Sequence, residues 1–327
     1  MSKITILGGG AWGSTIGQVL VDNRNQVLIY DINEKYVEKI NNHQHPIFNF
    51  SLLNIKATND LQTALDYSDI IILCVSTQQI RSLFKQINLI LKKKKKSFIN
   101  VSKGIELKSK KIISQILLEE INSDKITNYA CLIGPSHAEE VVQRKITFLL
   151  AASKSDDFLS RISQIFSSSY LKIDFSYDVF GCEICSAFKN ALSFVSGIVE
   201  LENFSQNAKS AFITFGIQEM KKILEIFPVE KETFLGLAGL GDLIVTSFNL
   251  NSRNYQAGKK INLGENLEKV LSSSSQVIEG IYNLEVFYHL SIEKKIFLPL
   301  IQSSYQVVFQ KKPIDCIFAN ILKKSYD

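Results

Sequence analysis

Short runs of apolar residues alternate, from residue 3 to about residue 175, with longer segments in which apolar positions recur every three or four residues. The short runs are typical of buried strands, and the longer segments are typical of helices with one apolar face. Alternation of this kind predicts βαβ units and a parallel sheet covered by helices. We predict strands at residues 4–7, 26–30, 70–75, 97–101, 130–133 and 147–151, and helices that include residues 34–42, 79–91 and 110–121.

The pattern changes after about residue 180. Strand signals fade there, and long helical patterns dominate at residues 183–200, 208–227 and 266–271 and from residue 279 onward. A chain of 327 residues is expected to form about two domains. We therefore predict an α/β protein with a doubly wound sheet over residues 1–180 and a second, mostly α-helical domain over residues 181–327. A hydrophobic fraction of 46% with 21% charged residues supports a packed core and excludes global disorder.

Composition and charge narrow the class of protein further. No apolar run approaches the ~20 residues that a membrane-spanning helix needs, and residues 4–7 are too short to be the apolar region of a signal peptide. The net charge of +5 suits anionic ligands and does not require a nucleic acid. Five cysteines, an odd number spread along the chain, favour reduced thiols. We expect a cytoplasmic protein with no nucleic-acid partner and no membrane span.

Three spaced glycines follow the first predicted strand. Gly8, Gly10 and Gly13 form the pattern GxGxxG between that strand and a helix. In dinucleotide-binding folds the first glycine permits a tight turn, the second lets the backbone approach a pyrophosphate, and the third lets the helix pack on the strand. The phosphates then face a helix N-terminus. The pattern predicts a Rossmann-type dinucleotide site, and the alternative is a glycine turn that is only structural.

Asp31 ends the second predicted strand, about 20 residues beyond the glycines, where an acid can bond the adenosine ribose hydroxyls. A carboxylate at this position would repel the 2′-phosphate of NADP, so Asp31 favours NAD, although Arg24 or Lys35 could offset the repulsion. The alternative is that Asp31 caps the helix that begins near Asn33.

Polar residues gather at two places that follow strands. Ser102, Lys103 and Gly104 come after one strand, and the segment 134–138, GPSHA, comes after another. Ligands of open α/β sheets bind beyond the carboxyl ends of the strands. We therefore expect Lys103 and Ser136 to face a ligand crevice.

The second domain carries three polar groups of its own. Lys189 and Asn190 lie within its first helix, and a glycine-rich segment, 234–243, ends near Asp242. Three glycines in so short a stretch do not suit a plain helix and imply a close backbone approach to a ligand or a neighbouring helix. The third group is the run 252–254, Ser-Arg-Asn, which offers a planar guanidinium and small donors suited to a phosphate.

The chain resembles the bacterial-type NAD(P)-dependent glycerol-3-phosphate dehydrogenases from residue 4 to about residue 312. The resemblance lies in the sequence and the order of the segments GGGAWG, SKGIE, GPSHAEEV, FKNAL, GLAGLGDL, NSRN and QVIEG. The resemblance implies interconversion of sn-glycerol 3-phosphate and dihydroxyacetone phosphate with NAD(H) or NADP(H), for phospholipid synthesis, by a homodimer. It makes Lys189 the proton acceptor for the substrate hydroxyl, with Asn190 beside it as a further ligand. The other substrate contacts that it implies are Lys103, Gly134, Ser136, Asp242, Ser252, Arg253 and Asn254. The cofactor contacts that it implies are Ala11, Trp12, Lys103, Ala138, Arg253, Val277 and Glu279, in addition to the glycines and Asp31.

Lysine chemistry fits this role under one condition. A free lysine has a pKa of about 10.4 and is a poor base at neutral pH. Burial and a second ammonium group, here that of Lys103, would each lower the pKa of Lys189 toward the working range. Asp242 could orient the amine, although an acid too close would raise that pKa instead.

The chain departs from the family pattern at two positions. Phe215 stands where the family commonly has an arginine, and Ser247 follows Thr246 where a cysteine is usual. Cys182 and Cys185 form a CxxC, but the four histidines do not complete a metal-ligand spacing with it. We therefore expect no metal.

Two other functions stay open at this stage. A related two-domain hydroxyacid or sugar-acid dehydrogenase would share the cofactor domain and would clamp a carboxylate instead of a phosphate. A non-catalytic dinucleotide sensor would also keep the fold. The presence of Lys103, Lys189, Asp242 and Arg253 argues against the sensor, because a sensor needs no base.

Overall fold

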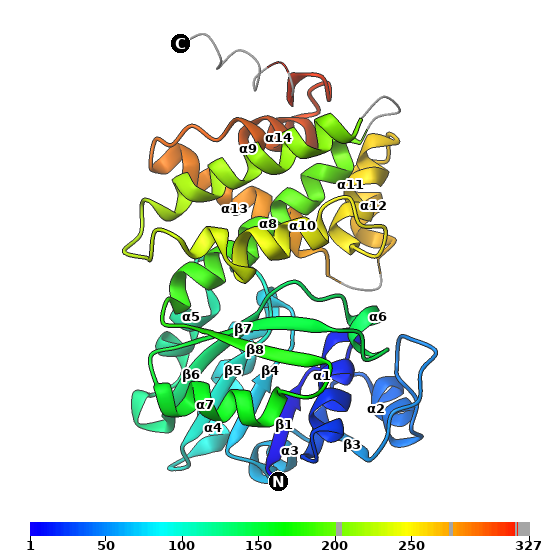
Figure 1. Cartoon of the computed structure of the whole chain (residues 1–327), viewed down its shortest axis with the longest axis vertical. Coiled ribbons are helices and arrows are strands. Elements are labelled where there is room, and N and C mark those ends of the chain that lie inside the picture. The colour runs from blue at the N-terminus through cyan, green and yellow to red at the C-terminus, as the bar shows by residue number, and fades with distance from the viewer. Residues whose placement is uncertain (201–204, 275–276, 318, 320–327) are drawn as a thin grey trace. The chain divides into compact units, whose positions relative to one another are not determined.

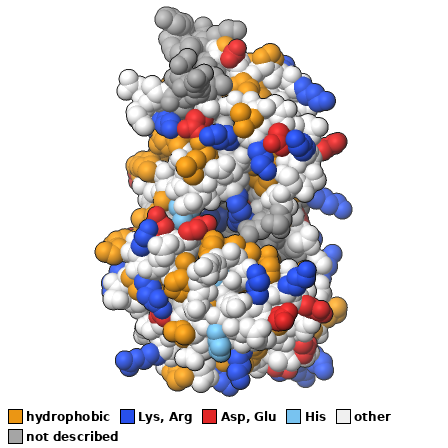
Figure 2. All heavy atoms as spheres, turned by 90° about the vertical axis from the view of Figure 1, so that its right-hand side faces the viewer, with side chains coloured by type: hydrophobic (Ala, Val, Ile, Leu, Met, Phe, Trp, Pro, Cys, Tyr) orange, Lys and Arg blue, Asp and Glu red, His pale blue; other side chains and the backbone are white. Residues whose placement is uncertain are grey.

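The computed structural model describes residues 1–200, 205–274, 277–317 and 319 (Figure 1). The chain divides into two compact units, one of Met1–Ser102 with Ile113–Val179 and one of Lys103–Ile112 with Phe180–Asp327. On the face shown in Figure 2, lysine and arginine side chains are interspersed with aspartate and glutamate, which agrees with a net charge of only +5.

The first unit is built on a sheet that, in the described residues, has eight strands in the order β3-β2-β1-β4-β5-β6-β7-β8. Neighbouring strands are parallel except β6 and β7, which are antiparallel. Strand order reverses between β1 and β4, which is where doubly wound folds bind their ligands. The strands are β1 (Lys3–Leu7), β2 (Gln26–Tyr30), β3 (Ile55–Thr58), β4 (Ile70–Leu73), β5 (Lys96–Asn100), β6 (Ile126–Ile133), β7 (Thr147–Ser153) and β8 (Leu171–Ser176).

Helices cover both faces of this sheet. One core cluster joins Ile4 and Ile6 of β1 to apolar side chains of α1 and α7, and a second cluster joins Leu7 to side chains of α3, α4 and α5. Successive residues of a strand point to opposite faces, so one buried strand contributes to both clusters. The helices are α1 (Ala11–Asp22), α2 (Glu34–Asn41), α3 (Leu61–Tyr67), α4 (Thr77–Leu91), α5 (Ile113–Glu120), α6 (Ala138–Val141) and α7 (Asp156–Phe166).

All six strands predicted from the sequence are present, and two further strands were missed. The missed strands, β3 and β8, are the two edges of the sheet. Both are half polar, with Lys56 in β3 and with Lys172 and Asp174 in β8, and most of their residues are not buried. Edge strands do not form the continuous apolar runs of buried parallel strands, so a search for such runs does not find them.

The second unit is helical, as predicted, and no strand is assigned to its described residues. Its centre is α8 (Val179–Val199), in which every residue from Gly181 onward is buried. Among the described residues, α8 is the helix whose length and apolar composition would permit a membrane span, and all of that apolar stretch is buried inside the protein. The other helices are α9 (Gln206–Leu224), α10 (Asp242–Thr246), α11 (Arg253–Asn262), α12 (Leu267–Ser272), α13 (Glu279–Glu293) and α14 (Pro299–Gln310), with a 3-10 turn η2 (Thr233–Leu235) and a π-helical turn η3 (Leu237–Gly241).

One segment does not follow the predicted domain boundary. Lys103–Ile112 lies within residues 1–180, yet it packs with the helical unit. The reason is local bonding: the amide of Ile105 donates to Asn283 of α13 at 3.1 Å, and Lys110 pairs with Glu293 of the same helix at 2.9 Å. Lys103 is therefore held by the helical unit rather than by the sheet that precedes it.

Candidate active site

The glycine loop after β1 has the geometry that a pyrophosphate needs. Gly8 has a φ of +109°, and a Cβ on Gly13 would lie 1.8 Å from the carbonyl oxygen of Gly8, so neither position accepts a side chain. A Cβ on Gly10 would meet no described atom within 4 Å, and Gly10 is the N-cap residue of α1. Open space therefore lies at a helix N-terminus, where backbone N–H groups favour an anion.

Asp31 holds this loop in place. Its Oδ2 accepts the amide N–H of Gly9 at 2.6 Å, and its Oδ1 accepts the amide N–H of Asn33 at 2.8 Å. The cap of α2 is Asn33, whose side chain accepts the amide N–H of Lys35 at 3.1 Å. The alternative in which Asp31 caps that helix is therefore wrong, and the carboxylate lies against the glycine loop.

His45 supports the first turn of α1. Its ring is buried, with Nε2 3.2 Å from the carbonyl oxygen of Ala11, and its Nδ1 accepts the amide N–H groups of Ile47 and Phe48 at 3.2 and 3.0 Å. Burial lowers the pKa of His45 to about 4, so the ring is neutral at physiological pH. The residue joins the segment after α2 to the first turn of α1.

The other predicted positions of the first unit follow strand ends. Strands β1, β4, β5 and β6 are parallel, so the glycine loop, Ser102 and the loop after β6 lie at one edge of the sheet. In the loop after β6, Gly134 has a φ of +142°, Ser136 donates to the carbonyl oxygen of Gly134 at 3.1 Å, and Ala138 begins α6.

Three charged side chains meet in the second unit. Asp242, at the start of α10, accepts from Lys103 Nζ at 2.6 Å, and its other carboxylate oxygen lies 3.2 Å from Lys189 Nζ on α8. The Asp242 and Lys189 side chains are only 1% and 6% exposed, and that of Lys103 is 16% exposed. The sequence placed all three in one site on resemblance alone, and the fold brings them into contact.

Thr246 completes this cluster and was not among the predicted site residues. Lys189 Nζ donates to Thr246 Oγ1 at 2.9 Å, and that hydroxyl donates to the carbonyl oxygen of Asp242 at 2.6 Å. Thr246 lies four residues after Asp242 on α10, so the two side chains share one helix face. That spacing was visible in the sequence, but it gains meaning only once both residues are known to be helical.

The electrostatics of the cluster favour proton transfer near neutral pH. Burial lowers the pKa of Lys189 most, Asp242 partly opposes this, and Lys103 and Arg253 lower it further, to about 7. Burial alone would raise the pKa of Asp242, but the two ammonium groups outweigh it and the pKa is lowered. The carboxylate stays ionised while Lys189 exchanges its proton in the range that general acid–base catalysis requires.

The glycine-rich segment before Asp242 forms the π-helical turn η3. A Cβ on Gly239 would lie 2.2 Å from the carbonyl oxygen of Phe234, so the backbone approach there requires glycine. The close approach at Gly239 is therefore to Phe234 of the adjoining turn η2, and not to the ligand or neighbouring helix that the spacing of these glycines predicted. π-Helical turns are frequent at functional sites, and this one ends directly before Asp242.

Several predicted polar residues bond to other parts of the protein. Asn190 donates to the carbonyl oxygen of Lys103 at 3.0 Å, and it accepts from the side chain of Asn254, also at 3.0 Å. Asn254 in turn accepts the amide N–H of Gly280 at 2.9 Å. Ser252 caps α11, and its hydroxyl lies 2.8 Å from that of Ser193 on α8. These contacts fix α8, α11, α13 and the Lys103 segment against one another.

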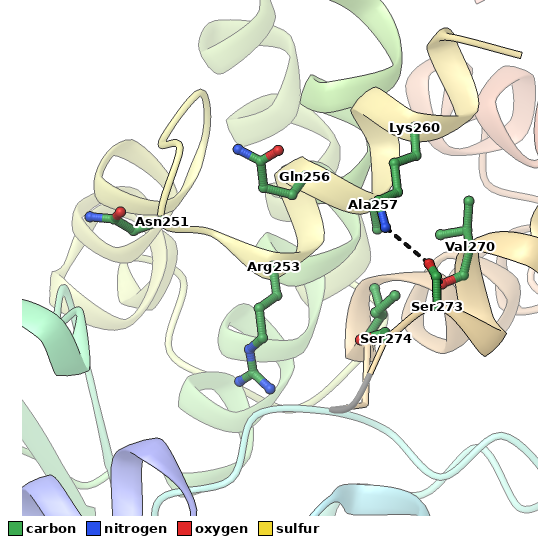
Figure 3. Close-up of a pocket in the computed structure, with 9 residues that line it drawn as sticks. Asn251, Arg253, Gln256, Ala257, Lys260, Val270, Ser273 and Ser274 are labelled. Atoms are coloured by element: carbon green, nitrogen blue, oxygen red, sulfur yellow. Dashed lines mark hydrogen bonds between the residues drawn. The ribbon is translucent and has the colours of Figure 1, made fainter. Parts of the chain in front are cut away.

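Arg253 is one of the residues that line a cavity between α11 and α12 (Figure 3). The cavity holds about 320 Å³, and its lining, as far as the described residues form it, includes the cations Arg253 and Lys260 and no carboxylate. Lys260 donates to Ser273 at 2.9 Å, as the dashed line in Figure 3 shows. An Arg253 guanidinium nitrogen lies 3.5 Å from the carbonyl oxygen of Val277, and Glu279 begins α13 shortly after. The lining favours an anionic group. It consists of Asn251, Arg253, Gln256, Ala257, Lys260, Val270, Ser273, Ser274 and Ile278.

Cys182 and Cys185 lie buried in α8 as free thiols. Within the described residues, no group of three His, Cys, Asp or Glu side chains is placed to hold a metal ion.

The two departures from the family pattern differ in their surroundings. Phe215 lies exposed on α9, and nothing in the structure explains it. Ser247 is buried, and within the described part of the chain its Oγ has no hydrogen-bond partner.

We expect Ser247→Cys to raise the free energy of unfolding by about 1 kcal/mol, because a thiol costs less to bury than an unpaired hydroxyl. Urea unfolding measures the change. Ser193→Cys is the matched control and should destabilise, because the Ser193 hydroxyl donates to the carbonyl oxygen of Thr246. A loss of stability in Ser247→Cys would contradict the prediction.

Known proteins resemble this chain over nearly its full length. Two family models match it, the NAD-dependent glycerol-3-phosphate dehydrogenase N-terminus at residues 3–159 and the corresponding C-terminus at residues 178–319. The glycerol-3-phosphate dehydrogenase (NAD(P)+) of Phytoplasma mali is 51% identical over 323 residues, which cover 98% of this chain and 97% of the relative. The enzyme of the same name from onion yellows phytoplasma is 49% identical over 325 residues, 99% of this chain and 98% of the relative.

Solved structures agree with these matches. Glycerol-3-phosphate dehydrogenase from Coxiella burnetii superposes with a TM-score of 0.91 at 25% identity, and the match covers 98% of each chain. A D-mandelate dehydrogenase in complex with NADH superposes with a TM-score of 0.62 at 17% identity, covering 96% of this chain and 99% of that one. The second likeness concerns the fold alone.

Proposed function

This chain belongs to the NAD-dependent glycerol-3-phosphate dehydrogenase family, and we propose that it interconverts sn-glycerol 3-phosphate and dihydroxyacetone phosphate with NAD(P)(H). The observation that carries the proposal is the contact of Lys103 with the buried pair Asp242 and Lys189. A lysine with a pKa of about 7 is suited to exchange a proton with a substrate hydroxyl. A protein that only sensed a dinucleotide would not need it.

Lys189 is the proposed general acid and base. In the oxidative direction neutral Lys189 takes the hydroxyl proton, and Asp242 and Thr246 hold the resulting ammonium group through the contacts they already make. NAD(P)+, when bound, accepts the hydride that leaves C2. In the reductive direction the ammonium of Lys189 gives its proton to the ketone oxygen. Substrate thus loses or gains one hydride and one proton in each turnover.

Arg253 is the proposed phosphate anchor. It stands at the first position of α11, where the helix dipole also favours an anion, and its planar guanidinium suits two phosphate oxygens. Anchoring one end of a three-carbon substrate restricts where C2 lies. We assign Lys103, Gly134, Ser136, Asn190, Asp242, Ser252 and Asn254 to the same substrate site, as the family resemblance implies.

The glycine loop is the proposed pyrophosphate site. The open space at Gly10 and the helix N-terminus behind it fit the charge and the approach of that group. Ala11 and Trp12, in the first turn of α1, are assigned to the cofactor with the glycines. On family resemblance we add Lys103, Ala138, Arg253, Val277 and Glu279 as further cofactor contacts.

Absorbance at 340 nm tests the activity. We expect purified protein to oxidise NADH rapidly when dihydroxyacetone phosphate is added and not when hydroxypyruvate is added, because the acceptor site is built for a phosphate. Turnover of hydroxypyruvate alone would favour a hydroxyacid dehydrogenase. Dinucleotide binding with no turnover of either ketone would favour a sensor.

Asp31 is the proposed determinant of cofactor choice. We expect wild-type protein to prefer NADH, and Asp31→Asn to raise the ratio of kcat/KM for NADPH to that for NADH about tenfold, because one unit of charge repulsion near a surface is worth about 1 to 4 kcal/mol. Asparagine keeps an oxygen for the Gly9 amide. Asp60→Asn, at the cap of α3, is the control and should leave the ratio unchanged. An unchanged ratio in Asp31→Asn would remove Asp31 from this role.

We further propose that the protein acts in the cytoplasm as a homodimer and supplies glycerol 3-phosphate for phospholipid synthesis. The five free thiols suit a reducing compartment, and the family resemblance implies the dimer and the metabolic direction. Light scattering after gel filtration measures the assembly, and a mass close to the 36.9 kDa of one chain would contradict the dimer.

A further inference from the structure

The segment that carries Lys103 is fixed by two asparagines. Asn190 of α8 donates to the carbonyl oxygen of Lys103 at 3.0 Å, and Asn283 of α13 accepts the amide N–H of Ile105 at 3.1 Å. The two bonds clamp the backbone on either side of Gly104. The position of the Lys103 ammonium against Asp242 therefore depends on helices that lie far away in the sequence.

Asn283 makes a second hydrogen bond, to the helix that carries Lys189. Its Nδ2 donates to the carbonyl oxygen of Ala187 at 3.0 Å, two residues before Lys189 on α8. The Asn283 side chain is fully buried, with 0% of the residue exposed. Asparagine is a poor residue for a helix interior, and a buried amide is costly unless both of its ends are bonded. One side chain thus connects the backbone near Lys103 to the helix that carries Lys189.

We propose that Asn283 is a positioning residue of the reaction: by bonding Ile105 and Ala187 it holds the ammonium group of Lys103 against Asp242, beside Lys189. This proposal rests on the proposed function, because it concerns the same proton transfer. Asn283 bonds backbone atoms of Ile105 and Ala187, so it acts through the segment that carries Lys103.

The charges around Lys189 give the proposal a measurable consequence. The polar groups that face Lys189 are Lys103, Asp242 and Thr246 at the cluster and Arg253 on α11. If the segment loosens, the ammonium of Lys103 withdraws from Asp242 toward solvent, and Asp242 is left to Lys189 alone. Both changes favour the protonated form of Lys189, so its titration should move to higher pH.

The experiment compares Asn283→Ala and the smaller change Asn283→Ser with the wild-type full-length protein. Trace acetylation of Lys189, followed by mass spectrometry across pH, reports its titration without turnover. The pH dependence of kcat/KM for glycerol 3-phosphate oxidation reports it with turnover. We expect both midpoints to rise by about half a unit to one unit, and hydrogen exchange in the peptide 103–112 to accelerate.

Ser291→Ala is the matched control. Ser291 is also fully buried on α13, and its hydroxyl bonds Tyr288 and Gln302. We expect this variant to lose stability and to leave the Lys189 midpoint unchanged. In a Lys103→Met background, Asn283→Ala should move the midpoint no further, because the charge through which it acts is gone.

Three results would overturn the proposal: an unchanged midpoint in a folded Asn283 variant, an equal shift in Ser291→Ala, or an additive shift in the Lys103→Met background. If Asn283→Ala does not fold, Asn283→Ser and the hydrogen exchange of wild-type protein test the proposal instead. Rapid exchange of residues 103–112 in wild-type protein would contradict the proposal that Asn283 fixes this segment. Absence of turnover in wild-type protein with an intact acetylation shift would instead reject the proposed function, and Asn283 would then be shown only to place Lys103 against Asp242.

Discussion

Replacement of Lys189 by methionine is expected to lower kcat about a thousandfold in both directions, within the ~10²–10⁴ range that a general acid–base contributes. Methionine keeps the unbranched, apolar stem of lysine and removes only the group that exchanges the proton. The Lys189 side chain is 6% exposed, so water is poorly placed to substitute for it. KM for dihydroxyacetone phosphate should change much less, because the phosphate is assigned to Arg253.

Initial rates at saturating cofactor measure this loss, and another buried lysine provides the control. Lys96 in the first unit is 2% exposed and donates to the carbonyl oxygen of Ser68 at 2.7 Å. Lys96→Met should lose stability and keep kcat within a few fold of the wild-type value, since Lys96 has no part in the proposed proton transfer. If Lys189→Met retained more than about a tenth of the wild-type kcat, Lys189 would not be the general acid or base.

The fold of the first unit could be predicted because its buried strands carry continuous apolar runs. Ile70 to Leu73 and Gln26 to Tyr30 read as strands in isolation, and both form the parallel core of the sheet. The edge strand Leu171–Ser176 was missed because its polar residues alternate with apolar ones, so it contains no continuous apolar run. The place of Lys103–Ile112 was equally hidden, because it depends on bonds to α13 and not on its own sequence.

The candidate site divides in the same way. The charged residues of the site could be predicted from the sequence, because each lies within a motif of the family. They are Lys103, Lys189, Asp242 and Arg253. The groups that set their positions are neutral or locally unremarkable in sequence. Asn283 is one amide in a long helix, and only the fold shows that it bonds both Ile105 and Ala187.

Loss of the Asp242 carboxylate should have the largest effect on stability. In Asp242→Asn the ammonium groups of Lys103 and Lys189 lose the carboxylate that lies between them, and breaking a buried ion pair in this way typically costs about 3 to 5 kcal/mol. The pKa of Asp242 is lowered in the folded protein, so its contribution is present above its unfolded value and is lost as pH falls through the folded value. Urea unfolding should therefore show a large deficit at pH 7 that shrinks in acid.

The direction in which Asp242→Asn shifts the pH dependence tests whether Lys189 is the base. Asp242 raises the pKa of Lys189 from where burial and Lys103 would set it, so Asp242→Asn should move the acidic limb of kcat/KM for glycerol 3-phosphate oxidation below about pH 7. Lys103→Met removes a positive charge and should move the same limb above about pH 7. Opposite shifts in the two variants are expected because the limb reports one ammonium group, whose pKa the carboxylate of Asp242 raises and the ammonium of Lys103 lowers. Shifts in the same direction would show that the limb belongs to another group, and Lys189 would then lose its role as the base.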